Sequence, residues 1–380
     1  MNDKAKVLIF IDWYKPGFKA GGPIRSISNL VSQLNSTYEF FIITRNKDYL
    51  ETTPYTGVKT NDWNNIDKAK VFYLSADKQN KSTIQKLIQE VSPDIIYCNS
   101  LYSPKFTLIP IRIAKKLNIK TVLAIRGMLS EGSLSVKSHK KRIFLTLIKA
   151  IGLFSKTTFH ATTLDEKNDI LKTFRNKTKI ITAQNLSENK NTEFHHKTKK
   201  ENELKMAFIG RIAPEKNTLY AIQVLASCAQ KIELDIFGPI YNQAYFKQCE
   251  NAIYQLPPNV VVKYKGVLNH DILDETLINY HVIYLPSTGE NFGHIIIEGM
   301  ANSCIPIISN KTPWQNLEQQ NIGFDIDLAD TRKFSEAIDS LAIMNEINLN
   351  EMRKNSFMFA SNIINNKETL KKYFSLFDIQ

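Results

Sequence analysis

Apolar and polar positions alternate along the first half of the chain in a series of strand-like and helix-like segments. Short unbroken apolar runs predict strands, and segments with an apolar residue every three to four positions predict helices between them. We expect strands at residues 6–11, 39–44, 70–74, 94–99, 121–125, 157–161 and 179–183, and helices at residues 22–34, 81–91, 104–117 and 165–174. Apolar strands that alternate with helices are typical of a parallel sheet covered on both faces.

A second series of the same kind follows a polar stretch at residues 186–204, which has the composition of a linker. Its predicted strands are residues 205–210, 232–237, 260–265, 282–285, 305–308 and 323–326, and its predicted helices are residues 216–229, 242–253, 271–279, 292–301, 332–344 and 350–377. The pattern therefore predicts an α/β protein with two Rossmann-like, doubly wound domains at residues 1–185 and 205–360. We expect a C-terminal helix at 361–380 to cross back to the first domain.

The place of a binding site follows from this fold class. Ligands of doubly wound sheets bind outside the carboxyl ends of the strands. We therefore expect the two domains to face a central cleft.

Length and composition agree with a two-domain globular protein. The 380 residues exceed what one ordinary core accommodates, and 43% of them are hydrophobic. The sequence has no run of about 18 apolar residues and no secretion-signal pattern, so we expect a cytoplasmic protein. Cys98, Cys228, Cys249 and Cys304 are widely spaced and lack metal-ligand spacing. They predict buried free thiols and no metal site.

The charge is distributed unevenly along the chain. The net charge is +12, yet residues 1–200 hold 34 Lys and Arg against 16 Asp and Glu, so the second half is mildly acidic. A basic half suggests a polyanionic partner, either anionic lipid or nucleic acid. Nucleic acid is disfavoured because aromatic residues do not interleave with the basic ones and no reader motif is present.

The segment from Val136 to Lys156, VKSHKKRIFLTLIKAIGLFSK, carries much of this basic charge. Its Lys and Arg residues accompany apolar residues at helical spacing, which predicts a helix lying on an anionic membrane surface. The alternative is a helix that buries its apolar face in the first domain and exposes its lysines.

The strongest candidate motif is STGENFGHIIIEG at residues 287–299. Glu290 precedes a predicted helix, and Glu298 lies about two turns along it. Gly293 leaves the first turn without a side chain, so a phosphate can approach the free N–H groups at the positive end of the helix dipole. A carboxylate such as Glu298 can accept hydrogen bonds from both ribose hydroxyls. The alternative interpretation is two solvated surface glutamates.

The second candidate motif is FIGRIAPEKN at residues 208–217, directly after the first strand of the second domain. Arg211 and Lys216 leave the carboxyl end of that strand on a glycine-containing loop. A guanidinium and an ammonium suit a diphosphate whose negative charge grows as a sugar leaves. The alternative is an exposed basic loop.

The third candidate motif is KAGGPIR at residues 19–25, in the first loop of the first domain. Gly21 and Gly22 precede a proline at a helix start, which makes a tight turn with exposed amides. Such a loop can face the same diphosphate, or it can be an ordinary turn.

Together, GRIAPEKN, ENFGHIIIEG and the GGP loop resemble glycosyltransferase family four, which contains retaining enzymes of the GT-B fold. The resemblance covers nearly the whole chain, and residues 99–144 are similar to a bacterial subgroup that builds capsule, O-antigen or exopolysaccharide. It implies a nucleotide-sugar donor linked to UDP or GDP, a saccharide acceptor that we expect to be lipid-linked, and neither a metal nor another cofactor. We expect a peripheral position on the inner face of the cytoplasmic membrane.

The resemblance also implies roles for individual residues. Glu290 would hold the hydroxyls of the transferred sugar and would act with the two cations of the second motif in catalysis. The remaining implied donor contacts are the diphosphate at Arg211 and Lys216, the ribose at Glu298, the pyrophosphate and sugar at the backbone of Phe292, Gly293 and His294, the phosphates at Gly21 and Gly22, and the base at Lys265 and Gly266.

The chain departs from many members of this family at the end of the predicted strand 121–125. Many members carry a histidine there, whereas this chain has Arg126 followed by Gly127. Arg126 can instead bind a phosphate of the donor or the acceptor. His160, at the end of another strand, is a further candidate for acceptor contact, although a structural role is favoured.

Other functions fit the sequence less well. An NAD enzyme is disfavoured because GxGxxG is absent after the first strand. A phosphorylase-like enzyme would need a lysine context for pyridoxal phosphate, and an epimerase on the same frame is a further possibility. A non-catalytic nucleotide-sugar-binding or adaptor protein of the same fold remains the main alternative, although it would not need all of Arg211, Lys216, Glu290 and Glu298.

Overall fold

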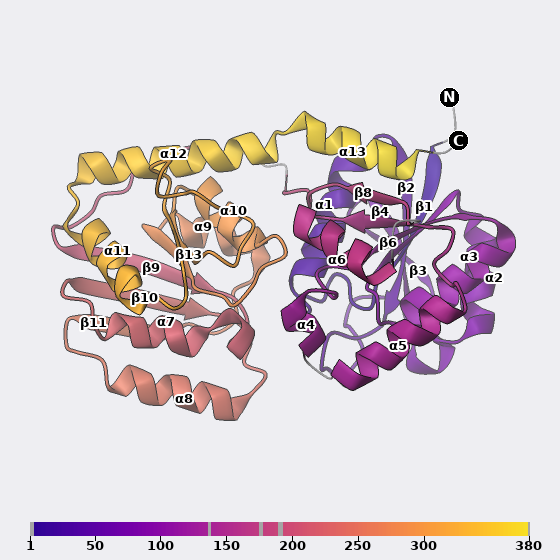
Figure 1. Cartoon of the computed structure of the whole chain (residues 1–380), viewed down its shortest axis with the longest axis horizontal. Coiled ribbons are helices and arrows are strands. Elements are labelled where there is room, and N and C mark those ends of the chain that lie inside the picture. The colour runs from indigo at the N-terminus through magenta and orange to yellow at the C-terminus, as the bar shows by residue number, and fades with distance from the viewer. Residues whose placement is uncertain (1–3, 136–137, 175–177, 189–192, 379–380) are drawn as a thin grey trace. The chain divides into compact units, whose positions relative to one another are not determined.

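The computed structural model describes residues 4–135, 138–174, 178–188 and 193–378 (Figure 1). Contacts within the chain divide it into two compact units. The first unit comprises residues 1–189 and 366–380, and the second comprises residues 190–365.

Within the described residues, the first unit is built on an eight-stranded sheet with the order β3-β4-β2-β1-β5-β6-β7-β8. The strands pair in parallel, except that β3 runs antiparallel to β4. The sequence did not predict β3, because its four residues, WNNI, include two asparagines that disfavour a strand. The strands are β1 (Ala5–Phe10), β2 (Tyr38–Arg45), β3 (Trp63–Ile66), β4 (Ala69–Leu74), β5 (Ile95–Asn99), β6 (Lys120–Ala124), β7 (Thr157–Ala161) and β8 (Ile180–Thr182).

Helices cover both faces of this sheet, so its strands are apolar on both sides. In β1, Val7 and Ile9 join the core under α1 and α13, whereas Leu8 and Phe10 join the core under α2, α3, α5 and α6. The helices are α1 (Gly22–Leu34), α2 (Lys81–Val91), α3 (Ile109–Leu117), α4 (Glu131–Ser135), α5 (Ser138–Ala150), α6 (Leu164–Phe174) and α13 (Lys367–Phe377), with a 3-10 turn at Ala76–Lys78 and a π-helical turn at Pro104–Leu108.

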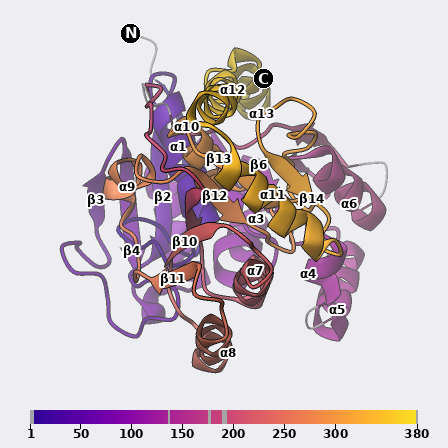
Figure 2. The ribbon, with the colours of Figure 1, turned by 90° about the vertical axis from the view of Figure 1, so that its left-hand side faces the viewer.

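The second unit is built on a six-stranded parallel sheet with the order β11-β10-β9-β12-β13-β14. Figure 2 looks onto this unit, with α7 and α8 on one side of the sheet and α10 and α12 on the other. Its strands are β9 (Glu203–Ile209), β10 (Lys231–Phe237), β11 (Val260–Tyr264), β12 (Val282–Leu285), β13 (Ile305–Ser309) and β14 (Phe324–Ile326). Its helices are α7 (Thr218–Leu225), α8 (Gln243–Tyr254), α9 (Leu273–Leu277), α10 (His294–Ala301), α11 (Thr331–Ile343) and α12 (Glu346–Ile364), with 3-10 turns at Pro214–Lys216 and His270–Ile272.

The C-terminal region differs from the single helix predicted at residues 350–377. The structure has α12 and then α13, and the side chain of Asn366 caps the new helix by accepting hydrogen bonds from Glu368 N and Thr369 N. Asparagine is a favoured N-cap residue, so a second helix begins where the sequence pattern continues unbroken. α13 packs Tyr373 and Leu376 into the core of the first unit.

The polar stretch predicted as a linker is divided between the units: Leu186 packs in the core of the first unit, and residues from 193 on are attached to the second. Lys197 is buried, and its ammonium donates to the carbonyls of Leu277 (3.0 Å) and Asn302 (3.1 Å). Arg353 on α12 is also buried and donates to the carbonyl of His195 (2.7 Å). Lys197, one of the cations of this stretch, therefore binds backbone carbonyls rather than water.

Candidate functional site

The site predicted in the second unit lies at the carboxyl edge of its sheet. β9 lies between β10 and β12, so the strand order reverses there, and this is where ligands of doubly wound sheets bind. Arg211 and Lys216 follow β9, whereas Glu290 follows β12. Two motifs about 75 residues apart in the sequence are thus brought to neighbouring strand ends.

Lys216 and Glu290 form an ion pair at this edge. The ammonium nitrogen of Lys216 lies 2.5 Å from Oε1 of Glu290, and the two side chains are 18% and 10% exposed. The lysine stem passes over Gly210, where an added Cβ would lie 3.6 Å from Cγ of Lys216. A charge pair this sheltered from water interacts more strongly than one on the open surface.

Backbone contacts fix the two loops that carry this pair. The amide of Thr288 donates to the carbonyl of Glu215 over 3.0 Å. The side-chain amide of Asn217 donates to the carbonyl of Pro286, also over 3.0 Å. The loops after β9 and β12 are therefore hydrogen-bonded to each other, which holds Lys216 and Glu290 in place.

Arg211 is more accessible than Lys216. Its guanidinium lies 3.2 Å from the carboxylate of Glu215, one helical turn away, and its side chain is 35% exposed. Exposed pairs of this kind contribute little to stability. The guanidinium can therefore change partners at small cost.

The loop before α10 has the geometry expected for an anion-binding turn. Gly293 has a φ of +73° and precedes the helix directly, and an added Cβ would lie 2.8 Å from Ile296 Cδ1. Phe292 is buried, and its carbonyl accepts a hydrogen bond of 2.7 Å from the indole of Trp314. His294 is buried as well. The side chains of Phe292 and His294 are thus packed in the interior, and the implied contact of their backbone with the donor stays a prediction.

Glu298 lies on α10, about one turn beyond its start, and is partly exposed. The next residue, Gly299, faces β12, where an added Cβ would lie 2.8 Å from Ile283. This close packing fixes the rotation of α10 on the sheet and therefore the direction in which Glu298 leaves the helix.

Lys265 and Gly266 lie at the same carboxyl edge, directly after β11. Gly266 has a φ of +79°, and its carbonyl accepts the amide of Gly238 over 2.9 Å. Gly238 in turn touches the chain after β9, since an added Cβ would lie 1.7 Å from Gly210 O. The structure therefore brings the predicted base-contacting turn to the loop that carries Arg211.

The predicted glycine loop of the first unit precedes α1. Gly21 is the N-cap residue, with φ +71° and ψ −126°, a conformation that favours glycine. A Cβ added at Gly21 or at Gly22 would have no neighbour within 4 Å. The loop is therefore open on the side where these side chains would be.

Arg126 has its guanidinium bound to side chains of the first unit. Its Nε donates to Asn99 Oδ1 (2.6 Å), its Nη2 donates to the hydroxyl of Tyr97 (2.9 Å), and its Nη1 donates to Asn185 Oδ1. Its φ of +54° is unusual for a residue with a side chain. These contacts give Arg126 a structural role, and its role in phosphate binding stays a prediction.

His160 is fully buried on β7, and both of its ring nitrogens have partners. Nε2 lies 2.7 Å from the carbonyl of Ala183, and Nδ1 lies 2.8 Å from the hydroxyl of Tyr97. The carbonyl can only accept, so Nε2 carries the proton and Tyr97 donates to Nδ1. Burial and then the charge of Arg126 lower the pKa of His160 to about 3. The ring is therefore neutral and structural.

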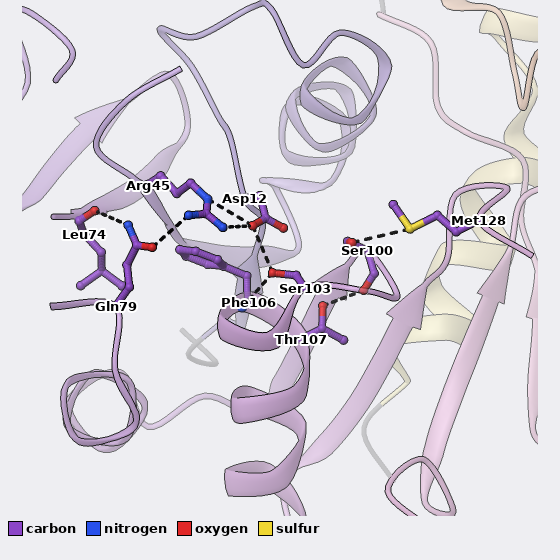
Figure 3. Close-up of polar contacts among 9 residues, drawn as sticks. All are labelled: Asp12, Arg45, Leu74, Gln79, Ser100, Ser103, Phe106, Thr107 and Met128. Atoms are coloured by element: carbon purple, nitrogen blue, oxygen red, sulfur yellow. Dashed lines mark hydrogen bonds and ion pairs between the residues drawn. The ribbon is translucent and has the colours of Figure 1, made fainter. Parts of the chain in front are cut away.

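The first unit also holds an ion pair that the sequence interpretation missed. Asp12, just after β1, pairs with Arg45 at the end of β2 over 2.6 Å, and Ser103 joins them (Figure 3). Charged residues that follow the apolar runs 6–11 and 39–44 were the available signal, because parallel neighbours end at the same edge.

In the part of the chain that the structure describes, no group of three or more His, Cys, Asp and Glu side chains is placed to hold a metal ion. No described helix is both long and apolar enough to cross a bilayer.

Comparison with known proteins identifies the second unit. Residues 189–357 match the family described as glycosyl transferases group 1. The second unit is a glycosyl transferases group 1 domain. Arg211, Lys216, Glu290 and Glu298 all lie within this domain. No curated protein matches the chain in sequence.

Solved structures of similar fold cover both units of this chain. HepE of Anabaena, in complex with UDP and glucose, has a TM-score of 0.70 at 15% identity and covers 98% of this chain and 99% of its own. Sucrose-phosphate synthase of Thermosynechococcus elongatus has a TM-score of 0.67 at 14% identity, with 99% and 98% covered. WaaG, a glycosyltransferase involved in lipopolysaccharide biosynthesis, has a TM-score of 0.67 at 12% identity, with 98% and 100% covered. The predicted α/β fold of the GT-B class, with two Rossmann-like units, is confirmed.

Proposed function

We propose that the chain is a retaining glycosyltransferase that moves a sugar from a UDP- or GDP-linked donor to a saccharide acceptor, without a metal. The observation that carries this proposal is the Lys216–Glu290 pair at the strand reversal of a glycosyl transferases group 1 domain. A lysine ammonium can bind a phosphate, and a neighbouring carboxylate can bind sugar hydroxyls. A nucleotide sugar presents phosphates and sugar hydroxyls side by side.

The cations of this site suit the diphosphate leaving group. An ammonium has three donors, so Lys216 can keep Glu290 with one of them and give the others to phosphate oxygens. Arg211 adds a forked guanidinium at a partly exposed position, which matches phosphate geometry. Such groups stabilise the negative charge that develops as the leaving group departs.

The proposed reaction is a front-face displacement. The bond between the anomeric carbon and the diphosphate oxygen breaks, and the acceptor hydroxyl forms its bond to the same face of that carbon. The hydroxyl proton passes to a departing phosphate oxygen, so no protein base is required. Glu290 orients the sugar, and Glu298 holds the ribose, which lowers the entropic part of the barrier.

The first unit would bind the acceptor, and we propose that this acceptor is lipid-linked and serves the synthesis of capsule, O-antigen or exopolysaccharide. WaaG, a structure of similar fold, is involved in lipopolysaccharide biosynthesis, and HepE of similar fold holds UDP and glucose. The first likeness supports a role in a surface polysaccharide pathway, and the second supports a nucleotide-sugar donor.

The outer face of α5 supports a peripheral position on the inner face of the cytoplasmic membrane. Three apolar residues are spaced four positions apart here: Ile143 and Leu147 on α5, and Ile151 just beyond its end, and they are 62%, 60% and 63% exposed. Lys140 and Lys149 are exposed on the same helix. Exposed apolar side chains beside lysines favour an anionic lipid surface. Val136 and Lys137, at the start of the predicted segment, lie outside the described residues.

A thermal-shift screen tests the donor half of the proposal. Wild type and Arg211→Ala are heated with UDP, GDP, CMP and ADP in the presence of EDTA. Binding to the folded state should raise the melting temperature by mass action. We expect a shift with UDP or GDP that the variant lacks. No shift with any of the four nucleotides would contradict the proposal.

A turnover assay then separates an enzyme from a binding protein. Release of UDP or GDP from UDP-glucose and GDP-mannose is followed with EDTA present, and the anomer of any product is read by NMR. Turnover with retention supports the transferase. Binding without release of nucleotide from any sugar donor would favour the adaptor instead.

A further inference from the structure

The loop that carries Glu290, residues 286–293, is attached to a second loop that the proposed reaction does not involve. This second loop follows β13 and comprises residues 310–315. β12 and β13 are parallel neighbours with Leu285 in register with Ile308, so the two loops leave the carboxyl edge of the sheet side by side. Contacts between them therefore decide how firmly Glu290 is held.

Two hydrogen bonds join the start and the middle of the Glu290 loop to the end of β13 and the loop after it. The hydroxyl of Ser309 donates to the carbonyl of Ser287 over 2.5 Å. The amide of Glu290 itself donates to the carbonyl of Lys311 over 3.0 Å. The second bond fixes the backbone from which the Glu290 carboxylate reaches Lys216.

Trp314 holds the far end of the same loop. Its indole Nε1 donates to the carbonyl of Phe292 over 2.7 Å, and the two rings meet edge to face with their centroids 5.1 Å apart. The residue is 4% exposed, and its own amide donates to Thr312 Oγ1 over 3.2 Å. A buried indole normally satisfies its single N–H group in this way. The bond has a fixed direction, so it sets the point at which the loop turns into α10.

The helix that follows the loop has a separate attachment. α10 packs on β12 through Gly299, where an added Cβ would lie 2.8 Å from Ile283, and Ile296 and Met300 are buried in the core of the second unit. The helix would therefore keep its place without Trp314, whereas the stretch 287–292 would lose one of its three bonds to β13 and the loop after it. The two parts of the STGENFGHIIIEG motif thus depend on different contacts.

We propose that Trp314 is a positioning residue for the transferred sugar, because it fixes the Phe292 carbonyl and, through it, the loop that carries Glu290. This inference rests on the proposed transferase function, since it concerns the sugar part of the donor. Arg211 and Glu298, which would bind the nucleotide part, stand on the loop after β9 and on α10. Loss of Trp314 should therefore impair the handling of the sugar more than the binding of the nucleotide.

Trp314→Phe tests this assignment on the full chain, because it keeps an aromatic ring in the core and removes the N–H donor. Two quantities are measured with EDTA present: the affinity for free UDP and GDP by calorimetry, and the rate of nucleotide release at saturating UDP-glucose or GDP-mannose. We expect the rate to fall by about ten- to 100-fold, since small misplacements of a reacting group have effects of this size. The affinity for the free nucleotide should stay as in the wild type.

Trp63→Phe is the matched control in the first unit. The indole of Trp63 donates to Glu90 Oε1 over 2.9 Å, and its ring meets Phe72 edge to face at 5.2 Å. The variant therefore loses the same kind of bond and keeps the same kind of ring contact. Both its release rate and its nucleotide affinity should equal those of the wild type.

A second variant covers the case in which Trp314→Phe fails to fold. Thr312→Val keeps the shape of the side chain but removes the hydroxyl that bonds to the backbone of Trp314 at both its amide and its carbonyl. It leaves the indole in place with a less fixed backbone, so we expect a smaller loss of about three- to ten-fold in the release rate. Nucleotide affinity should again be unchanged.

The possible results separate this inference from the proposed function. An unchanged release rate in folded Trp314→Phe, or in folded Thr312→Val where the first variant does not fold, overturns the positioning role and leaves the transferase standing. Equal losses of rate and of nucleotide affinity overturn it as well, because Trp314 would then support the whole site and not the sugar part. A wild type that binds neither nucleotide, or releases none from either sugar donor, contradicts the transferase itself, and the role given to Trp314 fails with it.

Discussion

The carboxyl edges of the two sheets each hold a partly buried ion pair, but the two pairs are built differently. In the second unit, a flexible lysine makes one contact of 2.5 Å with Glu290. In the first unit, Asp12 is bound by two nitrogens of Arg45 and by Ser103. A single ammonium contact can be shared with an incoming anion, whereas the forked and stacked arginine cannot turn easily. The difference indicates that Lys216 can exchange its partner for a ligand anion, whereas Asp12 and Arg45 hold one fixed geometry.

The largest expected effect comes from removing the shared cation. Lys216→Ala takes away charge that would stabilise the departing diphosphate, so we expect the transfer rate to fall by about 100- to 1,000-fold, as for other single electrostatic groups in active sites. The measurement is nucleotide release under saturating sugar donor.

A lysine in a similar ion pair on the surface provides the control for Lys216→Ala. Lys263 pairs with Glu233 over 3.2 Å on neighbouring strands of the same sheet, but it is 53% exposed. Lys263→Ala should leave the rate within about two-fold, because exposed pairs are worth little. Similar losses in both variants would mean that Lys216 acts through general surface charge, and the contrast between the two edges would disappear.

The second effect concerns stability and compares two arginines. Arg126→Ala removes three hydrogen bonds and leaves side-chain partners unsatisfied, so we expect a loss of about 2–3 kcal/mol in the free energy of unfolding. Arg211→Ala should change it by less than about 0.5 kcal/mol, because its partner Glu215 is half exposed. Urea unfolding followed by fluorescence measures both values.

For nucleotide binding we expect the opposite order, with the larger loss in Arg211→Ala. We expect Arg211→Ala to lose nucleotide binding while it stays stable. An Arg126→Ala variant that is as stable as the wild type, yet defective in catalysis, would instead support the predicted phosphate role of Arg126.

The second-unit motifs can be recognised in the sequence because their signals are local. FIGRIAPEKN and STGENFGHIIIEG each span a strand end, a loop and a helix start, so the residues that meet in space are visible within two short windows. The ion pair between Lys216 and Glu290 was not visible, since it depends on β9 and β12 being neighbours.

The first-unit cluster could not be predicted in the same way. Asp12, Arg45 and Ser103 are separated by 33 and 58 positions, so no short window of the sequence contains two of them. Only the strand order β2-β1-β5 brings them together. The short antiparallel β3 and the break at Asn366 were missed for a related reason, because tertiary contacts and one cap outweigh the local pattern.

The third effect is a dependence of stability on pH that arises from buried histidine. The folded-state pKa of His160 is lowered to about 3, whereas an unfolded histidine titrates near its ordinary value of 6.5. Below pH 6.5 the unfolded chain binds the proton and the folded chain does not, so stability is lost as the pH falls toward 3. Between pH 7 and pH 5 we expect a loss of about 2 kcal/mol from this group.

His160→Gln should reduce the pH dependence by that amount, and His139→Gln, at an exposed position of α5, should not. His281 in the second unit adds a similar dependence, because burial lowers its pKa to about 4. Unfolding in urea at pH 7 and pH 5 gives the comparison. An unchanged pH dependence in His160→Gln would mean that the ring can be protonated in the folded chain and that the first-unit network is less rigid than its contacts indicate.

The smallest expected effect concerns the outer surfaces of the two units. Leu147 on α5 is 60% exposed beside lysines, and Ile343 on α11 of the second unit is 59% exposed. If the first unit docks on lipid, Leu147→Gln should weaken binding to vesicles of phosphatidylglycerol and phosphatidylcholine by about 1–2 kcal/mol, or roughly five- to thirty-fold. Ile343→Gln should have no effect on vesicle binding. Equal sedimentation of both variants with the vesicles would show that α5 does not face the membrane, and the basic charge of the first unit would then need another partner.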